Sequence, residues 1–283
     1  MDPRNYQIIT LSTFILVGVT RLGFQIDWLN ALVIISVALL AQRFLFAAGQ
    51  EKSALISSLS LVLLLRTDLV WLAGFAALLA IVSKRFVRFN GAHLFNPSAF
   101  ALVMVTGLSS QAYISPGQWG ALGLAAFLVL GAGLMVVTRA QRLDVALSFL
   151  FTWLGIVFLR GWYLGDPITI AVHQMQSGAL LLFAFFMITD PKTTPLDRYA
   201  RMGFGVSVAV LAAILQFNFY LSAAAIYALV ALAPLVTILN LYTRNKTNVK
   251  ENTIKNHVNY NCIYSAFQRR KRDGILRVLR CQS

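Results

Sequence analysis

The amino-acid sequence predicts an all-α, polytopic integral membrane protein of about ten transmembrane helices. Hydrophobic residues make up 58% of the 283 residues and charged residues only 12%, whereas charged residues form about 25% of a typical water-soluble domain. The mean hydropathy is +0.72. The charges gather between apolar runs that approach the roughly 20 residues a helix needs to cross a bilayer. This composition excludes an ordinary water-soluble domain.

Ten apolar runs are expected to form the spans, several of them short for a full crossing. They cover 6–20, 28–43, 53–66, 68–84, 96–113, 118–138, 144–161, 175–189, 202–217 and 219–241. The first run follows Met1-Asp2-Pro3-Arg4 and has no small-residue cleavage site after it. We therefore interpret it as a retained span and not as a signal peptide.

Lys and Arg fall unevenly on the two sides of this arrangement. Up to residue 241, the side of the N-terminus carries eleven of them and the opposite side three, Arg21, Arg66 and Arg160. Cytoplasmic loops retain positive charge. Both ends of the transmembrane region, and the Thr189-Asp190-Pro191 stop, are therefore expected on the cytoplasmic side.

Residues 242–283 differ sharply from the transmembrane region 1–241. They hold ten Lys or Arg against Glu251 and Asp273, and so contribute +8 of the net charge of +14. The basic balance is thus no sign of nucleic-acid binding. This tail lacks the apolar density of a packed core and is expected to be disordered. Alternatives are a short amphipathic helix on anionic lipid and an extension without function.

Metal-ligating residues are sparse. Cys262 and Cys281 lie in the tail, and the three histidines, His93, His173 and His257, show no ligand spacing. Iron–sulfur centres need about four thiolates. The sequence therefore predicts no metal site, so that any redox cofactor is organic or belongs to a partner.

Two segments share a pattern that indicates an internal repeat. "KSALISSLSLVLLLRTD" (52–68) and "QSGALLLFAFFMITD" (176–190) both run from a serine through Ala-Leu and an apolar stretch to Thr-Asp. Five spans separate them, and an odd offset reverses the direction of the second copy. We expect two inverted halves, about 1–115 and 116–241, with Thr67 and Asp68 facing outside. The alternative is a chance match of two apolar helices.

The second copy ends abruptly at Thr189-Asp190-Pro191. Proline disfavours a helical residue before it and cannot donate an amide hydrogen, so the helix should end near Thr189. Asp190 then lies at the negative end of the helix dipole, where a nearby cation would stabilise it. Local candidates are Lys192, Arg198 and Arg201. The segment forms either an ordinary anchored loop or a broken-helix site for a polar ligand.

A second motif is expected on the same face, "SKRFVRFNGAHLFNPSAFALV" (83–103). Asn96 followed by Pro97 is typical of a helix start, and Lys84, Arg85 and Arg88 form a basic cluster before it. A helix N-terminus beside cations can bind the phosphate of a flavin or nucleotide. The alternative is that these cations only reflect the orientation of the chain in the membrane, and that Asn96-Pro97 is an ordinary capped helix start.

"HLFNPSAFAL" and "FFMITDPKTTP" together resemble two related membrane subunits, over roughly residues 35–240. These are the B subunit of sodium-translocating NADH:quinone reductase and the D subunit of the Rnf complex, including shorter D-like members found beside enediyne biosynthesis genes. The resemblance implies inverted five-helix repeats in a bacterial inner membrane. It also implies electron transfer with flavin as carrier, other complex subunits as partners, and coupling to sodium or proton movement in the large complexes.

Two departures from the family limit this inference. Relatives with covalent FMN attach it to the threonine of a Ser-Gly-Ala-Thr motif, whereas the nearest string here is Ser177-Gly178-Ala179-Leu180. Leucine has no hydroxyl, so we expect no covalent FMN.

The second departure concerns ion coupling. The acids before the tail all lie at span ends or in loops, whereas ion paths usually need such groups inside the membrane. An autonomous pump is therefore not expected.

The sequence thus predicts a subunit of a flavin- or quinone-linked electron-transport complex, holding a non-covalent FMN or riboflavin, or a quinone. The expected cofactor-binding residues are Lys84, Arg85, Arg88, Asn96, Asp190, Lys192 and Thr193 on the cytoplasmic side, with Thr67 and Asp68 as outer counterparts. No catalytic residue is assigned. The alternatives are a small-molecule or ion transporter on the same inverted repeat, and a non-catalytic scaffold.

Overall fold

The structure is a computed structural model that describes residues 3–21, 23–46, 49–89, 92–115, 141–175, 177–240 and 243. The described chain is mostly helical, with four short strands. The chain as a whole is divided into two units, Met1–Thr237 and Ile238–Ser283. Most of the second unit, and with it the expected tail, lies outside the described residues.

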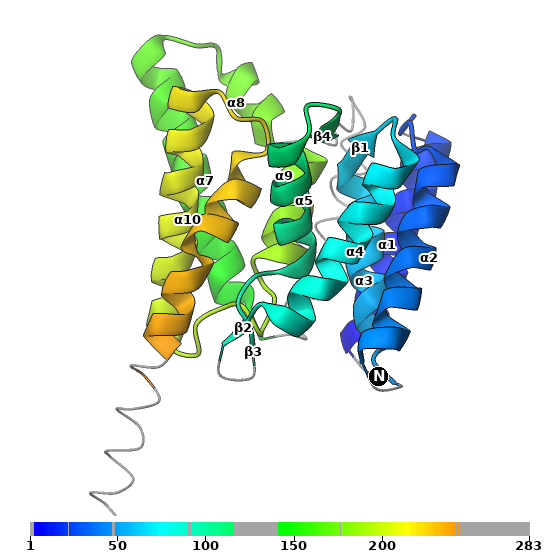
Figure 1. Ribbon diagram of the computed structural model, residues 1–283. Helices are drawn as coiled ribbons and strands as arrows, with labels where there is room; N and C mark the ends of the chain where they lie inside the picture. The colour runs from blue at the N-terminus through cyan, green and yellow to red at the C-terminus, as the bar shows by residue number, and fades with distance from the viewer. Residues whose placement is uncertain are drawn as a thin grey trace, which may run out of the picture. The chain divides into compact units, whose positions relative to one another are not determined.

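The first five helices pack side by side (Figure 1). They are α1 (Pro3–Arg21), α2 (Trp28–Leu45), α3 (Glu51–Leu64), α4 (Val70–Phe86) and α5 (Pro97–Leu108). Both α1 and α2 pack against α3, and α4 contacts α2 and α5. Close approach of α4 is possible because Ala73, Ala76, Ala77 and Ala80 present a fully buried small-residue face, as is typical of helix contacts in membranes.

Two small antiparallel sheets lie at opposite ends of these helices (Figure 1). Strand β1 (Leu65–Thr67) follows α3 directly and pairs with β4 (Ala112–Ile114), so that Arg66 lies opposite Tyr113. Strand β2 (Arg88–Phe89) follows α4 and pairs with β3 (Ala92–His93). Each sheet therefore fixes the chain where it leaves one helix and enters the next.

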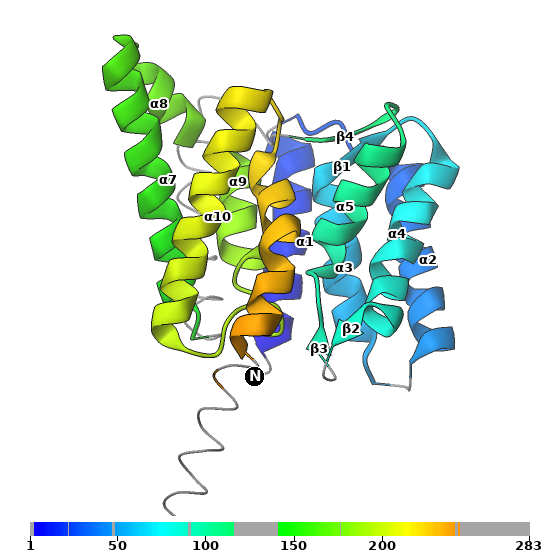
Figure 2. The same ribbon diagram turned by 60° about the vertical axis from the view of Figure 1, so that its left-hand side comes forward.

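The second half of the described chain is built on α7 (Leu143–Leu164) and α10 (Arg198–Phe219), which pack along each other (Figure 2). In the sequence, α7 and α10 are separated by α8 (Ile168–Met175), α9 (Gly178–Leu182) and the π-helical turn η1 (Phe183–Met187). A final apolar helix covers Ala224–Asn240. Its Tyr227 hydroxyl lies 2.8 Å from that of Thr106 in α5, which joins it to the first half.

Nine of the ten expected spans lie in the described residues, two of them except for one residue each, and each of the nine overlaps a helix. The run 118–138 lies outside the described residues. Among the described helices, α2, α7 and α10 are long and apolar enough to cross a membrane individually. The all-α membrane class is thus supported, while the count of ten crossings and the inverted repeat stay predictions.

Two helix boundaries differ from expectation. The helix expected over 96–113 ends at Leu108, because residues 112–114 pair with β1 as a strand. The helix expected over 175–189 begins later, at Gly178 after the N-cap Ser177, and passes from α9 into the π-helical turn η1. Strand pairing with a distant segment sets the first limit, and local capping by Ser177 sets the second.

Candidate functional site

A cavity of about 470 Å³ with both polar and apolar walls lies at one end of the helices, the end where β2 and β3 are found. We call it the Asp190 cavity. Its polar wall comes from the starts of α1, α3 and α5, the end of α4, and the loop after η1, and includes Arg4, Ser53, Lys84, His93, Asn96, Asp190 and Lys192. Phe185 and Phe186 of η1 supply an apolar part of the wall.

Asn96 connects the two sequence motifs at this cavity. As predicted, it caps α5: its Oδ1 accepts from the Ala99 amide at 3.2 Å, and Pro97 is the first helical residue. Its Nδ2 donates to the carbonyl oxygen of Met187 at 3.2 Å. The Asn-Pro helix start and the Thr-Asp-Pro helix end are therefore in direct contact.

Pro191 explains why the Met187 carbonyl is available. In a continuous α-helix this carbonyl would accept from the amide of the residue four positions later, which is Pro191 and has no N–H. The Asp190 amide reaches it only at 3.5 Å. The side chain of Asn96 thus supplies a donor to a helix end that proline leaves unsatisfied.

The Asp190 carboxylate is held by its own loop. Its Oδ1 accepts a hydrogen bond from the Lys192 amide at 3.1 Å. The backbone carbonyl of Asp190 accepts from the Thr193 amide and the Thr194 hydroxyl. Within the described part of the chain it forms no ion pair. Arg201, one of the expected partners, pairs instead with Asp144 at 2.6 Å. One side of Asp190 therefore remains open toward the cavity and its cations.

Lys84 is the most buried cation at the cavity, with 4% of its surface exposed. Its Nζ donates to the carbonyl and hydroxyl oxygens of Ser53, at 2.9 and 3.2 Å. Together with Arg4 and Lys192 it gives three basic side chains against the single carboxylate of Asp190. The Asp190 cavity is consequently suited to an anionic or electron-rich ligand.

His93 also lines the cavity and is buried. Its Nδ1 has no hydrogen-bond partner among the described residues. Burial lowers the pKa of His93 to about 4, an effect that Asp190 opposes and that Lys192, Lys84 and Arg88 reinforce. The imidazole is therefore neutral at physiological pH and can take part in hydrogen bonding without adding charge.

The predicted site residues divide into four groups. Lys84, Asn96, Asp190 and Lys192 meet at the Asp190 cavity. Arg85 and Arg88 are exposed near the same end and do not line it. Thr193 is buried in the loop and also stays out of the lining. Thr67 and Asp68 lie at a second cavity, at the other end of α3.

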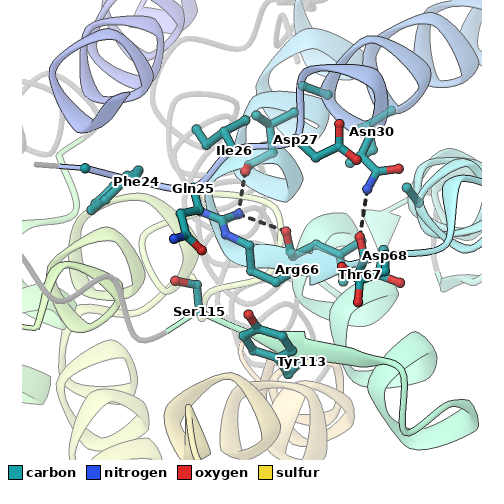
Figure 3. A pocket seen from close by; sticks show the side chains of 16 residues that line it. Phe24, Gln25, Ile26, Asp27, Asn30, Arg66, Thr67, Asp68, Tyr113 and Ser115 are labelled. Carbon is teal, nitrogen blue, oxygen red and sulfur yellow. Dashed lines mark hydrogen bonds between the residues drawn. The ribbon is translucent and has the colours of Figure 1, made fainter. Parts of the chain in front are cut away.

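This second cavity, which we call the Arg66 cavity, has a volume of about 580 Å³. It lies between the segment 23–27, the start of α2, and the β1–β4 sheet. Figure 3 shows the Arg66 side chain within it, near Gln25 and Ser115. Asn30 closes one side by donating from Nδ2 to the Thr67 carbonyl at 2.7 Å. Thr67 and Asp68 thus line a cavity together with several other polar side chains.

Several lining residues were not predicted. Ser53, Ser57 and Ser60 lie on one face of α3 and line the Asp190 cavity; their spacing of four and three residues is a usable sequence signal. Asn30 and Thr67 are 37 residues apart, and nothing local in the sequence indicates their contact.

Cavities with polar side chains lie at both ends of a strongly apolar helical layer, which is the arrangement expected of an integral membrane protein. Residues 108–248 match the NQR2, RnfD, RnfE family. This match covers just under half of the chain and confirms the resemblance to membrane electron-transport subunits of that family. The match includes Thr189-Asp190-Pro191, while Asn96 lies outside it.

Curated relatives agree with this assignment. The chain is 35% identical over 130 residues to the D subunit of the ion-translocating oxidoreductase complex of Salmonella enteritidis PT4 and to that of Salmonella gallinarum. The aligned stretch is 45% of this chain and 35% of each relative. The chain therefore spans about a third of the length of the relatives that it matches.

Proposed function

We propose that the protein is a membrane subunit of an ion-translocating oxidoreductase type of complex, and that its Asp190 cavity holds a non-covalent flavin, FMN or riboflavin, or a quinone. The observation that carries this proposal is the 3.2 Å hydrogen bond from Asn96 to the Met187 carbonyl. It joins the two family-like motifs around one cavity. The π-helical turn η1 supports it further, because such turns are frequent at functional sites.

The wall of the cavity fits such a ligand chemically. Phe185 and Phe186 offer apolar contact to a planar ring. Lys84, Arg4 and Lys192 can bind a phosphate group or ring oxygens, and Asp190 and His93 can orient ring N–H or O–H groups. A flavin or quinone would supply the electron-carrying chemistry, and the residues of this chain would bind and orient it.

The remaining features of this proposal rest on the predictions made from the sequence. Ten spans form two inverted five-helix halves, about 1–115 and 116–241, with the Asp190 cavity on the cytoplasmic side of a bacterial inner membrane. Residues 242–283 form a basic cytoplasmic tail. The partners are lipid and other subunits of the complex. Leu180 lacks the hydroxyl that a phosphoester bond needs and lies within α9, so the cofactor is held without a covalent bond.

Purification of the full chain in mild detergent tests the proposal. We expect flavin or quinone to be released by acid or organic solvent, with absorption and mass spectrometry identifying it, while the protein mass stays that of the unmodified chain. A protein mass increased by covalent FMN would contradict non-covalent binding. Absence of both flavin and quinone from the purified protein would contradict the redox function itself.

A transporter is the second candidate function, and one observation favours it. The two cavities share α3, since Ser60 lines the Asp190 cavity and Val62 lines the Arg66 cavity. Two residues of a helix correspond to about 3 Å of rise, so the cavities approach each other from opposite ends. Solute flux into proteoliposomes, from protein without a bound chromophore, would support transport over electron transfer.

A further inference from the structure

The Arg66 cavity contains a cation that no described residue neutralises. Arg66 Nη1 donates to the carbonyl oxygens of Val62 and Leu65, at 3.0 and 2.9 Å. Its Nε and Nη2 have no hydrogen-bond or ion-pair partner within the described part of the chain. A half-buried guanidinium without a carboxylate partner is costly. A bound anion would remove that cost.

The two acids at this cavity do not serve as the missing partner. Asp27 caps α2, where its Oδ1 accepts from the Leu29 amide at 2.9 Å. Asp68 is exposed. Neither carboxylate comes within ion-pair distance of Arg66 in the described structure, as the separated side chains in Figure 3 also show. Among the described residues, the guanidinium therefore keeps free donors for a bound ligand.

The guanidinium is also held in place. Two backbone carbonyls fix Nη1, and β1 is fixed on one side by its pairing with β4 and on the other by the Asn30 bond to Thr67. Tyr113, directly across the sheet from Arg66, and Ser115 add hydroxyls to the same wall. A fixed fork of N–H donors beside hydroxyl groups matches the geometry of an oxyanion.

We propose that the Arg66 cavity is a binding site for an oxyanion, a carboxylate or phosphate group, which Arg66 binds through Nε and Nη2. This site lies at the opposite end of α3 from the Asp190 cavity and does not depend on the proposed redox function. A soluble carboxylate or phosphate and the phosphate of a lipid headgroup share this chemistry, and the experiment distinguishes them.

The test measures thermal unfolding of the full chain. In detergent, inorganic phosphate and acetate are titrated against sodium chloride at equal ionic strength. In nanodiscs, phosphatidylglycerol is compared with phosphatidylcholine. Stabilisation by phosphate or acetate in detergent identifies a soluble anion as the ligand source, and stabilisation by phosphatidylglycerol alone identifies a lipid headgroup. Either result supports the site only if it depends on Arg66.

Matched variants test whether the stabilisation by anions or lipid depends on Arg66. We expect Arg66→Gln to lose the anion-dependent shift, Arg66→Lys to bind at least tenfold more weakly, and Arg21→Gln to behave like the parent protein, because Arg21 is exposed and lies outside the lining. An equal shift in Arg66→Gln and the parent, or no shift with any anion or lipid, would overturn the proposal.

Tyr113→Glu keeps the test decisive even if Arg66→Gln does not fold. Tyr113 is 61% exposed, so its replacement should be tolerated. A carboxylate there would lie directly across the strands from Arg66, at the spacing where opposite charges pair. We expect this variant to fold and to lose the anion response, because it carries its own anion. An unchanged anion response in Tyr113→Glu would contradict the proposal.

Discussion

At the scale of single residues, Asn96 has two separable roles. Its Oδ1 caps α5, and its Nδ2 donates to a carbonyl that Pro191 leaves without a helical donor. Serine can still cap a helix but is too short to reach the carbonyl, and alanine can do neither.

The Asn96 variants should therefore form a graded series. Loss of a cap costs about 0.5–2 kcal/mol, and loss of one hydrogen bond about 1 kcal/mol. We expect Asn96→Ser to lower the free energy of unfolding by about 1 kcal/mol and Asn96→Ala by about 2–3 kcal/mol, as measured by chemical denaturation in detergent. Equal stability of the two variants would show that the cap contributes nothing.

His93 should make stability depend on pH. Its pKa is lowered to about 4 in the folded protein from an ordinary value of 6.5, so below pH 6.5 the unfolded chain gains a proton that the folded protein does not. Stability should fall as the pH drops from about 6.5 to about 4, with no further loss from this group below that. Unfolding temperatures measured across this range check it.

The control for this prediction is His173, which is exposed. We expect His93→Gln to flatten the pH profile and His173→Gln to leave it unchanged. A parent-like slope in His93→Gln would show that other groups cause the pH dependence.

At the scale of helices, the contact between α7 and α10 depends on one glycine. A Cβ atom at Gly205 would lie 2.8 Å from the carbonyl oxygen of Val145 and would also meet the Ser148 hydroxyl. The Asp144–Arg201 ion pair fixes the same two helices. Backbone atoms cannot yield without a shift of the whole helix.

Gly205→Ala should therefore destabilise the protein by about 1–3 kcal/mol. Gly203 is the matched control on the same helix, because a Cβ there meets nothing within 4 Å. Gly203→Ala should be neutral or stabilising by up to about 1 kcal/mol, since alanine favours the helix. Comparing the unfolding temperatures of the two variants checks the packing; similar values for both would contradict it.

The helix limits show which signals the sequence carries. Asn96-Pro97 and Thr189-Asp190-Pro191 predict a helix start and a helix end correctly, because capping and proline geometry are local. The end of α5 at Leu108 was missed, since it depends on the pairing of residues 112–114 with β1. The π-helical turn is equally hidden in an unbroken apolar run.

The candidate site shows the same limit. Composition and motif spacing brought Lys84, Asn96, Asp190 and Lys192 into one predicted site, and these residues do meet. The Asn96–Met187 contact spans 91 residues, and the partner of Asn30 lies 37 residues away. Such contacts follow from packing and not from any local pattern, so Arg66 and Asn30 could not be assigned a role from the sequence.

At the scale of the whole molecule, two polar cavities lie at opposite ends of α3. The Asp190 cavity carries three basic side chains and one acid, and at the Arg66 cavity the single cation lies apart from two acids. The two ends thus differ in charge, which favours different ligands. An oxyanion at the second end would bind to Arg66 itself, because Asp27 caps α2 and Asp68 is exposed.

The ratio of bound chromophore to protein in two neighbouring variants tests the central claim most directly. Lys84 is buried and lines the Asp190 cavity, whereas the adjacent Arg85 is exposed and does not. We predict that the parent protein and Arg85→Gln retain flavin or quinone after purification and that Lys84→Gln loses most of it while remaining folded. Equal chromophore in both variants, or none in the parent protein, would contradict a cofactor site at the Asp190 cavity.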